Sequence, residues 1–168
     1  MRAQPAQVTH PYPPVFSADS RILILGTIAS PKSRETGFYY GHPANRFWRI
    51  LEILFDTEIP PTPQGRKQFL LCHNIALWDV LKSCTIVNAE DASIRNAVPN
   101  DMQAVLSAAP IRAVFTTGQT AARLYTQFCL PTHPALELHP LPSTSPANAR
   151  YSLARLVEEY RILLSYLA

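Results

Sequence analysis

The chain has 168 residues, of which 47% are hydrophobic and 16% are charged, so it can form one globular domain with a sizeable core and is unlike a disordered tail. Its net charge of +3 permits a polyanionic partner without requiring one. The three cysteines form no CxxC pair, and no apolar run reaches the roughly 18 residues of a membrane span. We therefore expect a cytoplasmic monomer without a membrane segment, a metal or a cofactor.

Strands and helices alternate along the chain. Short apolar runs predict buried strands, and apolar residues at helical spacing predict helices. In chain order, the predicted elements are a strand at 21–25, a helix at 46–55 capped by Asn45, a strand and a helical turn within 69–81, a helix at 101–109, a strand at 112–116, a helix at 119–129, a strand at 136–141 and a closing helix at 149–167. This order indicates an α/β fold: a three-layer α/β/α sandwich with a short central parallel sheet.

Proline-rich stretches mark the expected loops. The sixteen prolines are concentrated in the first fourteen positions, at 60–63 and between 131 and 146. Proline disfavours helix, so we predict surface connections there, including segment 59–67 (IPPTPQGRK). We expect one domain over 1–168, with the proline-rich segment 1–20 packed on it or extending from it.

Two segments that follow predicted strands are candidates for a binding site. Ligands of open parallel sheets bind beyond the carboxyl ends of the strands, which here lead into segments 26–45 and 142–146. Segment 26–45 contains three of the five glycines together with aromatic and polar residues. It is also longer than an ordinary connection, and such long loops are usually functional or disordered. Its aromatic residues favour function.

The first of these segments carries a family resemblance. GTIASPKSRETGFYYGHPANRFW, residues 26–48, resembles the first motif of mismatch-specific uracil-DNA glycosylases. The stretches IALWDVL, DASIRNAVPND, FTTGQTAARLY and LPSTSPANA resemble the hypoxanthine-DNA (DNA-deoxyinosine) glycosylases of the uracil-DNA glycosylase superfamily, so the resemblance spans most of 21–165. It implies an enzyme of base excision repair that binds damaged DNA, flips out a deaminated base (hypoxanthine) and hydrolyses its N-glycosidic bond.

The resemblance implies that Asn45 is the catalytic residue. Mismatch-specific enzymes place their catalytic Asn where this chain has Ile28, whereas the deoxyinosine branch uses the Asn of a His-Pro-x-Asn segment, here Asn45. Its amide oxygen could hold the attacking water. Judged from the residues alone, Asn45 is a helix N-cap. Leu141 stands where relatives carry a polar side chain, so help from that position for a uracil-type leaving group is absent.

The expected base-binding residues lie in the same segment. Tyr40 would stack on the flipped base, and the backbone N–H groups of Ile28, Ala29 and Ser30 would donate to O6 of hypoxanthine. Adenine has an amino donor there, so it would leave buried donors unpaired and be refused. Without the resemblance, these residues form a strand-to-loop turn and core aromatics. The expected base-binding set is Gly26, Thr27, Ile28, Ala29, Ser30, Phe38, Tyr40 and His42.

The expected DNA contacts lie in and just after the second segment. Hydroxyl and backbone N–H groups there could grip phosphates, and a small or apolar residue could wedge into the base stack. The expected set is Ser143, Thr144, Ser145, Pro146, Asn148 and Arg150. From composition alone, this is a hydroxyl-rich turn that caps the last helix.

Several alternatives remain open at this point. A uracil- or xanthine-DNA glycosylase is the nearest one, although Ile28 argues against strong uracil activity. A non-catalytic nucleic-acid-binding α/β module would leave Asn45 as a cap. The sequence lacks GxxxxGK[ST], GxGxxG and GxSxG motifs after its clear strands, which argues against phosphate-handling enzymes and serine hydrolases. Lys32 shows no sign of activation, so a monofunctional enzyme is expected. Asp79 is expected to cap a following helix.

Overall fold

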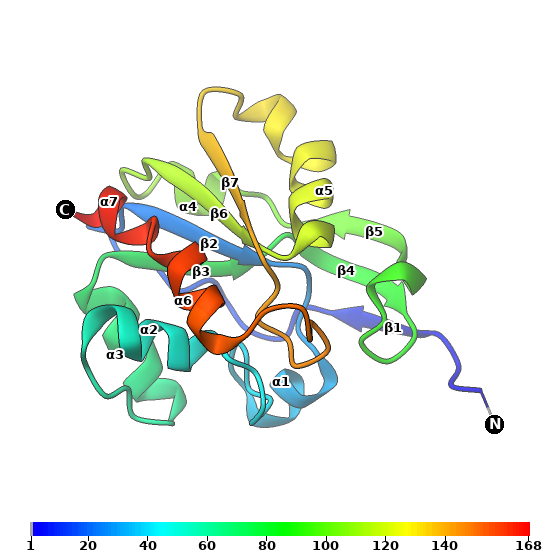
Figure 1. Ribbon diagram of the computed structural model, residues 1–168. Coiled ribbons are helices and arrows are strands. Elements are labelled where there is room, and N and C mark those ends of the chain that lie inside the picture. Colours follow the sequence, from blue (N-terminus) through cyan, green and yellow to red (C-terminus); the bar gives the residue numbers. More distant parts are fainter. Residues whose placement is uncertain (1) are drawn as a thin grey trace.

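A four-stranded parallel sheet forms the centre of the protein, shown in Figure 1 as a computed structural model that describes residues 2–168. The strand order is β3-β2-β6-β7, and every neighbouring pair is parallel. The strands are β2 (Ile22–Gly26), β3 (Ile75–Asp79), β6 (Ala113–Thr117) and β7 (Glu137–Leu141). All residues of β2 and β3 are buried, which explains their continuous apolar sequences.

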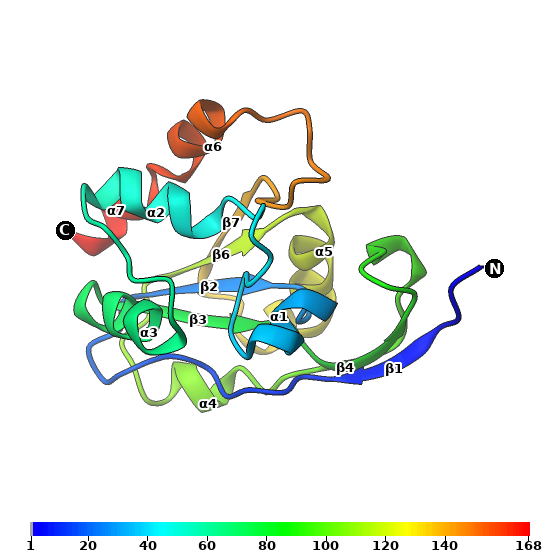
Figure 2. The ribbon, with the colours of Figure 1, turned by 90° about the horizontal axis from the view of Figure 1, so that it is seen from below.

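Helices flank this sheet. Figure 2 shows α2, α6 and α7 grouped on one side of the strands and α4 on the other. The helices are α1 (Pro31–Thr36), α2 (Phe47–Phe55), α3 (Pro63–Cys72), α4 (Gln103–Leu106), α5 (Gln119–Phe128), α6 (Leu153–Tyr160) and α7 (Leu163–Leu167), with short 3-10 helices at Asp91–Ser93 and Leu130–Thr132. The predicted α/β/α class with a central parallel sheet is confirmed.

A second, antiparallel sheet was not predicted. It has the order β1-β4-β5 and consists of β1 (Ala6–Thr9), β4 (Leu81–Ile86) and β5 (Arg95–Pro99). The helical turn expected after the strand in 69–81 is therefore wrong, because the chain continues from β3 directly into β4. The proline-rich N-terminal segment is packed on the molecule, since Val15 and Leu77 exchange two backbone hydrogen bonds of 2.9 Å.

Two predicted helix boundaries are also corrected. Segment 59–67 is only partly a loop, because α3 begins at Pro63. Proline has no backbone N–H, but an N–H in the first helical turn has no partner within the helix, so no hydrogen bond is lost there. The Thr62 hydroxyl accepts from the N–H of Gly65 and caps this helix. The closing helix is divided into α6 and α7, with a tighter turn between them in which Arg161 N–H donates to the Glu158 carbonyl.

The chain order of the strands determines where a ligand site can form. From β2 the chain leads to β3, the neighbour on one side of β2, and then to β6, the neighbour on the other side of β2. The direction of winding therefore changes between β2 and β6. In open α/β sheets, the loops at the carboxyl ends of two such strands diverge and leave a crevice. Here these loops follow Gly26 and Thr117.

Candidate active site

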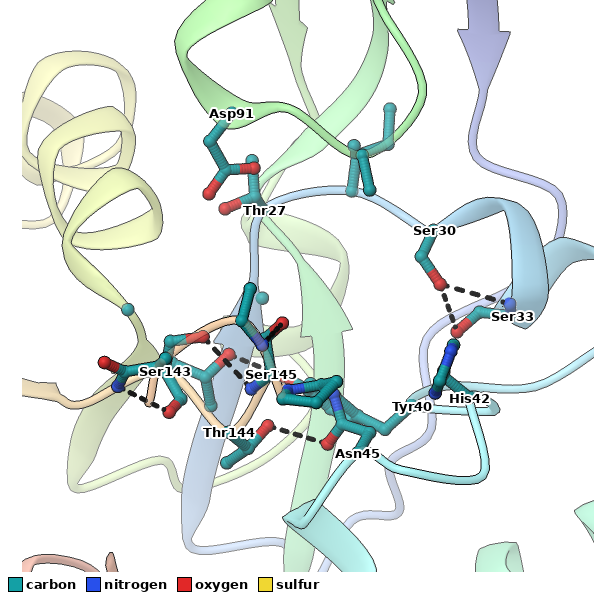
Figure 3. Close-up of a pocket in the computed structure, with 18 of the residues that line it drawn as sticks. Thr27, Ser30, Ser33, Tyr40, His42, Asn45, Asp91, Ser143, Thr144 and Ser145 are labelled. Atoms are coloured by element: carbon teal, nitrogen blue, oxygen red, sulfur yellow. Dashed lines mark hydrogen bonds between the residues drawn. The ribbon is translucent and has the colours of Figure 1, made fainter. Parts of the chain in front are cut away.

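A cavity of about 950 Å³ lies at this carboxyl edge of the parallel sheet, within the range of small-ligand sites. Figure 3 shows that its walls come from loops far apart in the sequence. The lining residues fall in segments 26–33, 39–45, 86–91, 117–119 and 140–151, joined by Tyr12, Asp79 and Glu159. Both segments that the sequence singled out therefore meet at one site.

Nearly all of the predicted site residues line this cavity; Phe38 does not. The Phe38 side chain is 8% exposed, and its ring stacks on Trp48 with 6.0 Å between centroids. Its expected base-binding role is corrected to core packing, because the aromatic cluster holds it away from the cavity. His42 does line the cavity; it is exposed, and its Nδ1 accepts from the N–H of Ala44.

Asn45 is held in place by two donors. Its Oδ1 accepts from the N–H of Phe47 at 2.9 Å and from the hydroxyl of Thr144 at 2.8 Å. Asn45 is not the N-cap that the sequence predicted, because helix α2 begins one residue later and Arg46 is its N-cap; the bond to Phe47 belongs to the turn that leads into the helix. A carbonyl oxygen has two lone pairs, so both are occupied. Nδ2 of Asn45 has no hydrogen-bond partner among residues 2–168, which leaves this donor available in the cavity wall.

The side chain of Arg46 fixes the loop that carries Thr144. Its guanidinium and backbone N–H donate only to carbonyl oxygens of that loop. The acceptors are Thr144 (3.1 Å from N and 3.4 Å from Nε), Ser145 (2.7 Å), Asn148 (3.0 Å) and Tyr151. These bonds explain how Asn45 and Thr144, 99 residues apart, come into contact. The sequence gives no signal for this role of Arg46.

A buried His–Asp pair forms the floor of the cavity, where Asp79 is the member that lines it. His10 Nε2 is 2.7 Å from Asp79 Oδ2, and the two side chains are only 3% and 6% exposed. His10 Nδ1 lies 2.8 Å from the carbonyl oxygen of Tyr12. The other carboxylate oxygen, Asp79 Oδ1, lies so close to Gly26 that a Cβ there would be 2.5 Å from it. The predicted helix cap at Asp79 is therefore wrong, and His10 was missed.

Tyr40 has a strained backbone beside the cavity. Its φ of +51° lies in the left-handed region, which costs a non-glycine residue about 1–2 kcal/mol. Its ring stacks on Phe47 with 4.0 Å between centroids, and its hydroxyl is 2.8 Å from Thr117 Oγ1. Burial, followed by the nearby charge of Asp79, raises the pKa of Tyr40, so its phenol stays neutral.

Free backbone donors lie at the start of the first segment. The N–H groups of Ile28, Ala29 and Ser30 donate to no acceptor among the residues that the structure describes. The Ser30 hydroxyl caps α1 by accepting from Ser33 N–H. Successive unpaired N–H groups beside a cavity can bind an oxygen acceptor or a developing negative charge.

Sequence reasoning missed several further lining residues, among them Thr117, Gln119 and Asp91. Thr117 and Gln119 follow strand β6, and the rule applied to the strands before segments 26–45 and 142–146 would have found them. Asp91 reaches the cavity from the connection between β4 and β5 (Figure 3). Because that antiparallel sheet was not predicted, Asp91 had no sequence signal.

The cysteines stand apart from this site. All three are free thiols, with Cys84 and Cys129 buried and Cys72 exposed. Burial raises the pKa of Cys129 to about 11, so its thiol is neutral. Within the described part of the chain, no group of three or more His, Cys, Asp or Glu residues is arranged to hold a metal ion. Over residues 2–168, no helix has the length and apolarity needed to cross a bilayer.

Comparisons with known proteins agree with this geometry. The family model "Uracil DNA glycosylase superfamily" matches residues 13–165. A hypoxanthine DNA glycosylase of Methanosarcina acetivorans is 32% identical over 151 residues, covering 86% of this chain and 90% of the relative. Another, of Methanosarcina barkeri, is 34% identical over 100 residues, or 59% of this chain and 63% of the relative. The solution NMR structure of a candidate uracil DNA glycosylase from Methanosarcina acetivorans superposes with a TM-score of 0.76 at 28% identity, covering 93% of this chain and 98% of that one. The chain belongs to the uracil DNA glycosylase superfamily.

Proposed function

We propose that this DNA glycosylase removes hypoxanthine from deoxyinosine in DNA by hydrolysing the N-glycosidic bond, the first step of base excision repair. Two relatives that carry the name hypoxanthine DNA glycosylase support the substrate. The observation that carries the chemistry is the fixed amide of Asn45 in the wall of a cavity large enough to admit a flipped nucleotide, with three free backbone N–H groups in the same cavity lining.

The cavity offers hydrogen-bonding groups that match hypoxanthine. The free N–H groups of Ile28, Ala29 and Ser30 donate to O6, where negative charge accumulates as the base leaves. Asp79 Oδ1 accepts from the N1–H group of the base. Adenine presents a donor in place of O6 and an acceptor in place of N1–H, so the backbone N–H groups and Asp79 Oδ1 would both be left without hydrogen-bond partners. Each buried unpaired group costs about 1–3 kcal/mol, which accounts for rejection of the normal base.

Asn45 positions the attacking water through its Nδ2 group. The sequence suggested the amide oxygen for this role, but Phe47 and Thr144 already occupy both lone pairs of Oδ1. A donor that binds one lone pair of the water leaves the other free to bond to C1′ of the sugar as the bond from C1′ to N9 breaks, and the water then passes its proton to the departing hypoxanthine anion. Because the sugar acquires oxocarbenium character and hypoxanthine delocalises its own charge, orientation of the water is sufficient.

Lys32, which also lines the cavity, supports a monofunctional enzyme. Its ammonium is 3.4 Å from the carboxylate of Glu35, and the Lys32 side chain is 39% exposed. A lysine that forms a Schiff base needs a desolvated or otherwise activated amine. Lys32 has neither environment, so the reaction ends at the abasic site.

The loop after β7 contacts DNA around the flipped nucleotide. Its exposed members Pro146 and Arg150 are placed to wedge into the stack and to pair with a phosphate. Ser143, Ser145 and Asn148 line the cavity beside them and contribute further polar contacts, and His42 contacts the sugar or phosphate from the opposite rim. Thr144 is 2% exposed and bonded to Asn45, so its part is to hold the catalytic amide. Flipping costs a few kcal/mol, least for a mispaired base.

The proposal also covers metal independence, oligomeric state and location in the cell. Displacement at C1′ by a water needs no Lewis acid when the leaving base stabilises its own charge, so we expect activity in the presence of a metal chelator. We propose that the enzyme acts as a monomer, as the sequence suggested. A DNA substrate agrees with the cytoplasmic location that the sequence suggested.

Excision from a panel of synthetic duplexes tests the function. Each duplex carries a single inosine, uracil, xanthine or normal adenine, and alkali cleavage reveals abasic sites under single-turnover conditions. The proposal predicts that inosine is processed fastest and adenine not at all. A clear preference for uracil or xanthine would assign the substrate to the neighbouring glycosylase activity. Binding of the duplexes without excision of any base would support the non-catalytic nucleic-acid-binding module.

A further inference from the structure

The His10–Asp79 pair contains a proton that the proposed chemistry does not consume. The carbonyl oxygen of Tyr12 can only accept, so His10 Nδ1 must carry a hydrogen. The 2.7 Å contact between His10 Nε2 and Asp79 Oδ2 requires a second hydrogen between these atoms. Whether that hydrogen resides on nitrogen or on oxygen, the pair as a whole has no net charge.

The free oxygen of the pair has a fixed chemical character. Asp79 Oδ1 lies against Gly26 and has no hydrogen-bond partner among residues 2–168. If Asp79 is ionised, Oδ1 is a carboxylate oxygen; if the shared proton is on Oδ2, Oδ1 is a carbonyl oxygen. In both cases Oδ1 accepts hydrogen bonds and cannot donate one.

We propose that His10 is a positioning residue that keeps the floor of the base cavity electrically neutral while Asp79 presents an acceptor to an N–H group of the flipped base. The inference rests on the proposed function, because it concerns how the same cavity binds a leaving base. A carboxylate without its partner would repel the negative charge that develops on the base as the bond breaks. His10 removes that repulsion and retains the acceptor.

Neighbouring ionisable groups do not replace His10. The rings of Tyr12 and Tyr39 lie 4.8 and 5.7 Å from the His10 ring. Burial, followed by the charge of Asp79, raises the pKa of Tyr12, Tyr39 and Tyr40, so these phenols are neutral in any practical assay. The positive charge of Arg34 lowers the pKa of Tyr12, but burial has the larger, opposite effect. His10 is thus the group in hydrogen-bond contact with the Asp79 carboxylate.

Comparison of His10→Gln, Asp79→Asn and the double variant tests the inference. Single-turnover excision of hypoxanthine should slow at least about tenfold in His10→Gln, equal to roughly 1.4 kcal/mol of barrier, because Asp79 becomes an unbalanced charge. Asp79→Asn should lose less than His10→Gln, since a neutral amide can face His10 with its nitrogen and the base with its oxygen. The double variant should be at least about threefold faster than His10→Gln, because the unbalanced charge is gone.

Rescue by the double variant is the readout that a purely structural role would not produce. Removal of a second side chain would add to a structural loss, whereas here it should reverse part of the loss by removing the unbalanced charge.

Controls separate this inference from the proposed function. His73→Gln removes another half-buried histidine, bonded to the Phe69 carbonyl and outside the cavity lining, and should leave excision unchanged. Melting temperature and affinity for DNA that already contains an abasic site check folding; if His10→Gln does not fold, His10→Asn replaces it. A wild type that excises neither hypoxanthine nor uracil would overturn both proposals. An active wild type with an equally active His10→Gln variant, or a double variant as slow as His10→Gln, would overturn only the role of His10.

Discussion

The cavity contains two side-chain pairs of opposite character, Asn45–Thr144 in its wall and His10–Asp79 at its floor. Each joins residues that are far apart in the sequence, and each leaves one polar atom without a partner among residues 2–168. In the wall pair, two neutral donors occupy the Asn45 oxygen, and the free atom is a donor. In the floor pair, the Asp79 carboxylate is balanced by an imidazole, and the free atom is an acceptor.

The difference shows how one site can treat the two sides of a breaking bond separately. Orientation of a water requires a rigid group but no charge, which the wall pair supplies. Binding of a leaving base requires an acceptor for its N–H that does not oppose the charge on its oxygen, which the floor pair supplies. Four variants follow in order of decreasing effect: the first three each alter one pair and leave the other in place, and the fourth alters Tyr40 beside them.

Arg46→Ala should produce the largest loss, because it removes the bonds that hold Thr144 next to Asn45. Several carbonyl groups lose a charged donor, so we expect the free energy of unfolding to fall by about 2–4 kcal/mol in a denaturant titration. Arg49→Ala, within the first turn of helix α2, is the matched control. The Arg49 side chain is 62% exposed, and its loss should change stability by less than about 0.5 kcal/mol. Equal stability of the two variants would refute the role given to Arg46.

Gly26→Ala should disturb the floor pair. The new methyl group would lie 2.5 Å from Asp79 Oδ1 and 3.0 Å from the Tyr40 hydroxyl, and Asp79 cannot retreat without losing His10. Overpacking of this kind lowers stability by about 1–3 kcal/mol, and excision should slow together with the fall in melting temperature. A Gly26→Ala protein with the wild-type melting temperature and rate would show that Asp79 Oδ1 is not held at the cavity floor.

Thr144→Val should affect the wall pair alone. The side chain keeps its shape but loses the hydroxyl that donates to Asn45 Oδ1. We expect the single-turnover rate to fall about tenfold, or roughly 1.4 kcal/mol, with little change in affinity for abasic DNA. In the Asn45→Ala background, the same substitution should have no further effect on the rate. An additive loss there would mean that Thr144 acts independently of Asn45.

Tyr40→Phe should have the smallest effect. It removes the hydroxyl bonded to Thr117 and retains the ring that we propose stacks on the base. Loss of one such hydrogen bond costs about 0.5–1.5 kcal/mol, which thermal melting can measure, and the excision rate should change less than in Thr144→Val. A rate loss larger than that of Thr144→Val would require a direct chemical role for the phenol.

The sequence predicted the parallel sheet better than the second sheet for a physical reason. The strands at 22–26 and 113–117 are buried on both faces, so their apolar runs are visible in the sequence. Strands β1 and β5 are short and largely exposed, and they form only because β4 pairs with them. Local patterns do not report such pairing.

The same contrast applies to the site. Asn45 and the segments after two strands could be predicted from motif resemblance and from the geometry of parallel sheets. His10 and Asp79 could not be paired, because they are 69 residues apart and meet through a β1–β4 contact that was not foreseen. Arg46 likewise gave no sign of its contacts, since a guanidinium that binds backbone carbonyls needs no particular partner residue.

The most direct test of the account compares Asn45→Ala with Asn45→Asp in single-turnover excision from an inosine duplex. An aspartate carboxylate can accept the same two bonds from Phe47 and Thr144, but it has no amide hydrogen to donate to the water. The account therefore predicts that both variants lose at least about tenfold, roughly 1.4 kcal/mol of barrier, while Asn45→Asp melts close to wild type. An Asn45→Asp protein that is as fast as wild type or faster would contradict the role of Nδ2, and an unaffected Asn45→Ala protein would leave Asn45 with a structural role alone.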